Sequence, residues 1–125
     1  MAVSNFDGIA AELTYTALDR NGAEIHGPNI TNPVRKVIQP GQQLPAIDFQ
    51  LFGEGLADSD ALGQIGIDST TDKTVGLFLA FDSIRSTMDG ARLSSDPIPF
   101  IVLPEIGDQE STTLILNNPN AGSVA

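Results

Sequence analysis

The sequence predicts an all-β fold: an antiparallel β-sandwich or related barrel of about eight short strands with extended terminal arms. Three observations favour this class. The 12 glycines and 8 prolines are spread along the 125 residues, so they divide the chain into short segments and disfavour long helices. The segments between them are rich in Ile, Val, Thr, Phe and Leu, which suit a pleated surface. These segments recur at intervals of roughly 10–15 residues, and none has the apolar period of an amphipathic helix.

The first strand is expected over Ile9–Ala17, where apolar and polar residues alternate with a period of two. Asn21-Gly22 follows, and this pair predicts a hairpin turn into a second short run, Ala23–His26, because both turn residues accept positive φ. Val34–Ile38 is the third candidate strand, and the turn residues Gln39-Pro40-Gly41 close it.

Alternation also predicts a strand over Ile47–Leu51, with one face directed inward. The main loop follows at Gly53–Gln64, and part of it, Leu56–Leu62, is expected to form one helical turn. Ile65–Asp68 is the next short strand candidate. Val75–Phe81 is apolar on both faces, which is typical of a central strand covered on both sides.

The remaining segments continue the pattern. Ile84–Met88 leads to Asp89-Gly90, which predicts a second hairpin turn. Ile98–Leu103 is flanked by prolines, so we expect it to start irregularly or to lie at a sheet edge. Thr112–Leu116 is the last candidate strand. We expect a single β domain over residues 1–125, with an N-terminal arm at 1–8 and a C-terminal tail at 117–125.

Charge and composition exclude several classes of protein. Sixteen acidic and six basic side chains give a net charge of −10, so no basic face is expected for direct nucleic-acid binding. The longest nearly apolar run, Ile98–Leu103, is far short of a membrane span. The N-terminus lacks the basic and apolar regions of a secretory signal, so we expect a protein made in a cytoplasm. The absence of cysteine excludes disulfides, thiolate metal sites and thiol nucleophiles.

No group of residues indicates a catalytic chemistry, so we expect neither an enzyme nor a cofactor. His26 is the only histidine, and no serine has the Gly-x-Ser-x-Gly setting of a hydrolase nucleophile. The segment from Asp58 resembles the opening of a calcium loop, but Leu62 and Ser69 stand where that loop needs ligands. A different oxygen-lined cation site remains an open alternative, and it would draw on Asp58, Asp60, Asp68 and Asp72.

Apolar residues outside the strand pattern indicate a protein that binds other proteins. Val3 and Phe6 fall in the expected arm, and Phe52 falls on the otherwise polar face of its strand. The alternative is that Phe6 caps the core and Phe52 enters it through a bulge. The candidate interaction residues, including two basic ones suited to an acidic partner, are Val3, Phe6, Phe52, Leu56, Leu62, Arg35 and Lys36.

In general character, a short, acidic, cysteine-free β chain without catalytic residues resembles the head decoration (cement) proteins of tailed bacteriophages. Those are small β-rich domains, often trimers, that reinforce the shell at junctions between capsid subunits. The resemblance implies a virion protein made in the host cytoplasm that binds the major capsid protein or another virion subunit. It also implies a homo-oligomer, with a trimer favoured. Two alternatives stay open: a carbohydrate- or cation-binding β-sandwich, and a tail or neck component of the particle.

Overall fold

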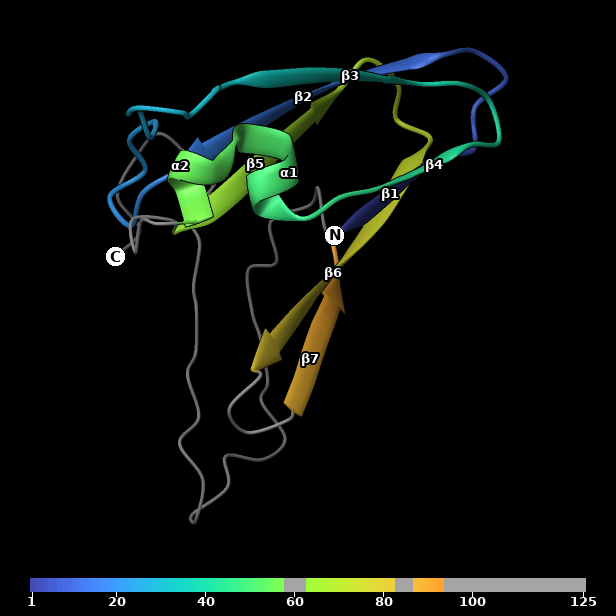
Figure 1. Cartoon of the computed structure of the whole chain (residues 1–125). Coiled ribbons are helices and arrows are strands. Elements are labelled where there is room, and N and C mark those ends of the chain that lie inside the picture. Colours follow the sequence, from blue (N-terminus) through green and yellow to red (C-terminus); the bar gives the residue numbers. More distant parts are fainter. Residues whose placement is uncertain (58–62, 83–86, 94–125) are drawn as a thin grey trace, which may run out of the picture. The chain divides into compact units, whose positions relative to one another are not determined.

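The computed structural model describes residues 1–57, 63–82 and 87–93. Within them, seven strands form two antiparallel sheets, and two short helices lie between β4 and β5 (Figure 1). The elements are β1 Ala2–Asn5, β2 Ala11–Leu18, β3 Val34–Ile38, β4 Gln43–Pro45, α1 Asp48–Phe52, α2 Glu54–Ala57, β5 Gln64–Ser69, β6 Thr74–Asp82 and β7 Thr87–Arg92. The predicted all-β sandwich class is therefore confirmed.

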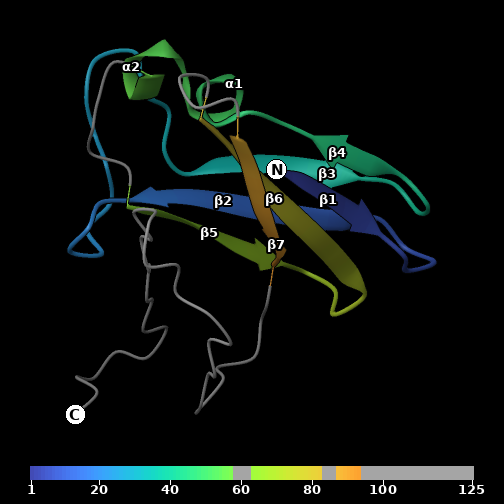
Figure 2. The ribbon, with the colours of Figure 1, turned by 90° about the horizontal axis from the view of Figure 1, so that it is seen from below.

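The strand order is β4-β1-β6-β7 in the four-stranded sheet and β3-β2-β5 in the three-stranded sheet. Figure 2 shows strands of the two sheets crossing at an angle in projection. Side chains from both sheets pack into one core together with residues of the helices. The buried members of this core are Val3, Leu13, Tyr15, Ala17, Ile25, Val34, Ile38, Leu51, Phe52 and Leu56.

Strand β2, which its alternating sequence predicts, is the centre of the three-stranded sheet. Ala11, Leu13, Tyr15 and Ala17 are buried on its inner face, and the residues between them are exposed or half-buried. Its partner β3 has the predicted bounds, Val34–Ile38. Its other partner, β5, contains the predicted strand Ile65–Asp68.

The turn predicted at Asn21-Gly22 is present, but the hairpin is shorter than expected. The Asp19 carboxylate accepts the backbone N–H groups of Asn21 and Ala23 at 2.8 and 2.9 Å, and Gly22 takes a φ of +83°. The returning chain forms only an isolated bridge, Leu18 to Glu24, instead of a strand over Ala23–His26. The side chain of Asn32 bonds to Ala17 where a strand partner was expected. Its Oδ1 accepts the Ala17 N–H at 2.9 Å, and its Nδ2 donates to the Ala17 carbonyl oxygen at 2.8 Å.

The expectation of an N-terminal arm at residues 1–8 is corrected by the structure, because the first half of this segment forms strand β1. This strand lies between β4 and β6 in the four-stranded sheet, and Val3 points into the core. Four residues with a single large apolar side chain give too short a pattern to be recognised as a strand. The pairing that forms β1 comes from β6, a distant segment of the chain.

The strand predicted over Ile47–Leu51 is also wrong, because this segment forms helix α1. Leu51 and Phe52 are adjacent and both buried, which a helix allows but the predicted strand with one inward face does not, and Leu56 of α2 completes the buried set. Gly53 ends α1 with a φ of +101°, and a Cβ there would lie 2.3 Å from the Asn29 carbonyl oxygen. The helices can therefore pack closely against the Pro28–Ile30 segment.

Strand β6 is central, as predicted for Val75–Phe81, but two further expectations fail. Val75, Leu77 and Leu79 are about half exposed, so the strand is not covered on both sides by the described residues. Asp89-Gly90 forms no turn, because both residues lie within β7, opposite Ala80 and Leu79. The candidate strands Ile98–Leu103 and Thr112–Leu116, the tail 117–125 and part of Ile84–Met88 lie outside the described residues, so the single domain over 1–125 stays a prediction.

Candidate functional site

The loop between β1 and β2 presents two large apolar side chains to solvent. Phe6 is 70% exposed and Ile9 is 63% exposed, the highest values among the large apolar residues described. Phe6 directly follows β1, in which Val3 and Asn5 are buried, and Ile9 lies two residues before Ala11, the buried first residue of β2. The exposed pair is therefore adjacent in sequence to strands that contribute to the buried core.

Asn5, which is buried, fixes the path of this loop. Its Nδ2 donates to the carbonyl oxygens of Ile9 at 2.8 Å and Ile38 at 3.0 Å. Its Oδ1 accepts the N–H of Asp7 at 2.9 Å. The Phe6 N–H donates to the Lys73 carbonyl at 2.9 Å, which ties the loop to the start of β6. Because the side chain and the backbone are both bonded, the loop is held before any partner arrives.

Asp7 supplies a second tie between the same two loops. Its carboxylate accepts from the Thr71 hydroxyl and from the Gly8 N–H, the latter at 2.7 Å, and lies 3.4 Å from the Lys73 Nζ. The Thr71 hydrogen bond, followed by the Gly8 N–H and the Lys73 charge, lowers the pKa of Asp7 below its ordinary value. Asp7 is thus ionised over the whole neutral range, and the Phe6–Ile9 loop stays tied to the β5–β6 turn.

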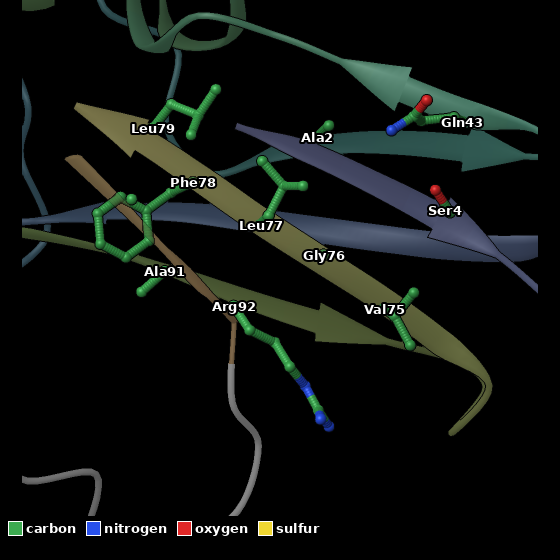
Figure 3. Close-up of a pocket in the computed structure, with 11 residues that line it drawn as sticks. Ala2, Ser4, Gln43, Val75, Gly76, Leu77, Phe78, Leu79, Ala91 and Arg92 are labelled. Carbon is green, nitrogen blue, oxygen red and sulfur yellow. The ribbon is translucent and has the colours of Figure 1, made fainter. Parts of the chain in front are cut away.

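A second apolar surface covers the outer face of the four-stranded sheet (Figure 3). Alternation along β6 puts Val75, Leu77 and Leu79 on the face opposite to the core, and these side chains are 48%, 43% and 45% exposed. Met88 of β7 is 62% exposed and lies opposite Phe81 in the register. We name Val75, Leu77, Leu79 and Met88 the outer apolar face.

A shallow hollow of about 690 Å³ lies over this region. Ala2 and Ser4 of β1 and Gln43 of β4 border it on one side, and Arg92 of β7 borders it on the other. Among the described residues that line the hollow, none is acidic, although the chain has 16 acidic residues. Arg92 is the only charged residue among the described residues that line the hollow.

The residues that the sequence singled out for interaction are not brought together. Val3, Phe52 and Leu56 are buried in the core, so they serve packing. For Phe52 this matches the alternative in which it enters the core, although through a helix and not through a bulge. Leu62 lies outside the described residues.

Three of the predicted interaction residues remain on the surface. Phe6 is exposed on its loop, so it does not cap the core. Arg35 and Lys36 are exposed on β3, and the Arg35 guanidinium lies 3.7 Å from the Glu12 carboxylate on the neighbouring strand. Arg35 thus already has a partner within the chain.

The structure also describes only some of the residues considered for a cation site or for catalysis. Asp58 and Asp60 lie outside the described residues, while Asp68 and Asp72 are exposed. The described residues contain no group of three or more potential metal-ligating side chains. His26 is exposed, with its Nε2 3.7 Å from a Glu24 carboxylate oxygen.

Sequence reasoning missed the outer apolar face and the exposure of Ile9. The signal for the first was present, because Val75–Phe81 is apolar at every position except Gly76. That pattern was interpreted as a strand covered on both sides. Ile9 was placed within the first strand, because its alternation with Ala11 and Leu13 continues that of β2.

Comparison with models of protein families, with curated proteins and with solved structures finds no match for this chain. Among the described residues, no helix has the length and apolar character needed to cross a membrane.

Proposed function

We propose that this chain is a non-enzymatic structural protein of a virion that binds an assembled shell and stabilises it, as a capsid decoration protein does. Its partner would be the major capsid protein or another virion subunit. The observation that carries the proposal is the Phe6–Ile9 loop. Two large apolar side chains, 70% and 63% exposed, stand on a loop whose backbone and side chains are hydrogen-bonded.

The physical reason is preorganisation. An aromatic and an aliphatic side chain that insert into a partner's pocket contribute most when the loop carrying them loses little freedom on binding. Asn5 and Asp7 supply that restraint through the bonds to Ile38, Thr71 and Lys73. We expect a docking loop to be held in place by hydrogen bonds and ion pairs of this kind next to its exposed apolar side chains.

Stabilisation of the shell follows from mass action. A protein that binds the assembled shell better than its separate subunits shifts the equilibrium toward assembly. A homo-oligomer would bind through several copies of the loop at once and would gain avidity. The net charge of −10 keeps such a protein soluble before it binds.

The first test asks where the chain is found. Particles would be purified on a density gradient from cells that naturally make this chain, and the fractions would be probed with an antibody against it. We expect the chain to sediment with assembled particles. Its absence from every particle fraction would refute the proposed function.

The second test asks which residues bind. A Phe6→Ala, Ile9→Ala double variant should bind particles that lack the chain at least about tenfold more weakly in a co-sedimentation assay. Val37→Ala is the matched control, because Val37 is 59% exposed on the other sheet. Deleting residues 1–7 is unsuitable, since it removes β1. Equal binding by the double variant and the control would show that the loop is not the docking site.

A further inference from the structure

Strand β5 forms one edge of the three-stranded sheet and leaves part of its backbone without a strand partner. In the order β3-β2-β5, only β2 pairs with it (Figure 2). The Glu12 carbonyl oxygen accepts the Thr70 N–H at 3.1 Å, so the even-numbered residues of β2 turn their backbone N–H and C=O groups toward β5. Alternation then directs the N–H and C=O groups of Ile65 and Ile67 away from β2, where no other described strand pairs with them.

The core side of this edge is only partly covered. Ile65 and Ile67 pack against the core but are half-buried, whereas Ala17 and Tyr15, which they face on β2, are buried. A strand added beside β5 would pair with the outward N–H and C=O groups and cover the two isoleucines at once. The chemistry of this edge therefore fits an extended peptide backbone.

Two other edge strands carry features that discourage such pairing. Strand β4 is three residues long and ends in Pro45, which has no N–H to donate. On β3, Lys36 lies opposite the buried Leu13, in the row of side chains that faces the core, and Arg35 precedes it. Strand β5 has six residues and contains no proline, lysine or arginine. Of these three edges, β5 is the one open to a further strand.

We propose that the edge of β5 binds an extended, basic segment of a partner protein as an additional strand. The segment would place apolar side chains beside Ile65 and Ile67, and a basic side chain on the opposite face beside Asp68. Asp68 is exposed and forms no ion pair with any described residue. The net charge of −10 attracts a cationic segment and repels a second copy of this chain. This contact is separate from shell binding, because it uses neither Phe6 nor Ile9.

The first measurement is amide hydrogen exchange of the full chain without a partner, followed by NMR. The amides of Ile65 and Ile67 should exchange at least about tenfold faster than those of Gly66 and Asp68, which face β2. Slow exchange at all four positions would overturn the proposal, because the edge would then already be covered by another part of the chain or by a second copy.

The second measurement titrates the isotope-labelled full chain with two synthetic peptides of about eight residues, one of alternating valine and lysine and one of alternating valine and glutamate. The basic peptide should shift the amide signals of Ile65 and Ile67 and bind at least about tenfold more tightly than the acidic one. Equal affinity for the two peptides, signal changes centred on another strand, or no binding would each contradict the proposal.

A backbone variant tests whether the outward N–H takes part. Ile67→Pro removes this N–H but none that faces β2, and the preceding Gly66 accommodates the ring. Ile67→Ala is the matched control, because it loses the same side chain and keeps the N–H. Ile67→Pro should bind the basic peptide at least about fivefold more weakly than Ile67→Ala.

The opposite edge of the sheet provides a second control. Val37 of β3 pairs with Glu12, so its N–H also points away from β2, and Val37→Pro should bind the basic peptide as the unchanged chain does. Circular dichroism checks that each variant is folded, and if Ile67→Pro is not, the exchange and titration results decide alone. Equal binding by the folded Ile67→Pro and Ile67→Ala variants would overturn the proposal, as would a loss of binding in Val37→Pro.

Discussion

The two sheets present opposite chemistry on their outer faces. On the three-stranded sheet, Glu12, Thr14 and Thr16 of β2 alternate with buried residues, and Arg35 and Asp68 flank them on the neighbouring strands. On the four-stranded sheet, the corresponding positions of β6 are Val75, Leu77 and Leu79. The outer face of the three-stranded sheet is therefore polar and suited to contact with water, whereas the outer face of the four-stranded sheet carries apolar side chains that favour burial.

An alternating strand and a uniformly apolar strand therefore carry different information about their surroundings. The alternating sequence of β2 specifies its own environment, with a core on one side and solvent on the other. The apolar sequence of β6 specifies cover on both sides, but Leu77 on the outer face and Phe78 on the inner face are each 43% exposed, so the described residues cover neither side fully.

Two leucines, one on each sheet, should differ strongly in what they contribute to stability. Leu13→Ala should lower the free energy of unfolding by about 2–5 kcal/mol, because Leu13 is fully buried and its loss leaves a cavity. Leu77→Ala should lower it by less than about 1 kcal/mol in dilute monomer, because Leu77 is already 43% exposed. Urea denaturation followed by circular dichroism measures both. Equal losses in dilute solution would contradict the comparison, since Leu77 would then be as well covered as Leu13.

The next effect concerns Tyr15, which lies on the inner face of β2. Burial raises the pKa of Tyr15 to about 12, from an ordinary value of 10.0. Between these two values the unfolded chain has lost the phenol proton and the folded chain keeps it, so stability falls as pH rises. The expected loss is about 2–3 kcal/mol between pH 10 and pH 12, with no contribution below pH 9.

Tyr15 is the only tyrosine and the chain has no tryptophan, so absorbance of the phenolate reports this titration directly. Tyr15→Phe is the control, because it keeps the ring and removes the ionisable group. Its stability should lose this component of the alkaline dependence. A phenolate signal that appears near pH 10 in the folded protein would show that the inner face of β2 is open to water.

The sequence predicted the three-stranded sheet much better than the four-stranded sheet. Strands β2, β3 and β5 could be found because apolar and polar residues alternate, or because turn residues bound a short apolar run. Strand β1 could not, because its only large apolar side chain, Val3, gives no apolar period, and its pairing with β6 is set by tertiary structure. Helix α1 was mistaken for a strand because five residues fit either period.

The candidate sites were predictable to a smaller extent. Phe6 was expected to be an interaction residue because it is apolar outside any strand pattern, and the structure leaves it exposed. Phe52 looked similar in sequence but is buried, because Gly53 and Gly55 let its helix pack against the Pro28–Ile30 segment. Exposure depends on close contacts between distant segments, which a local pattern does not contain.

The smallest effect compares one glycine from each sheet. A Cβ on Gly76 of β6 would lie 2.5 Å from the Leu93 Cδ1 and 3.0 Å from the Ala2 carbonyl oxygen, so Gly76→Ala should lower the free energy of unfolding by about 1–3 kcal/mol. A Cβ on Gly66 of β5 would meet only the Thr16 carbonyl oxygen, at 3.9 Å. Gly66→Ala should leave stability unchanged or raise it by about 0.5 kcal/mol, because alanine restricts the unfolded chain.

Thermal and urea denaturation of the two variants side by side measure this difference. The effect of Gly66→Ala depends on open space above the polar face of the three-stranded sheet, and that of Gly76→Ala on the contacts that Leu93 and β1 make across β6. A loss in Gly66→Ala as large as that in Gly76→Ala would mean that the polar face is itself covered in solution. The contrast between the two outer faces would then be wrong.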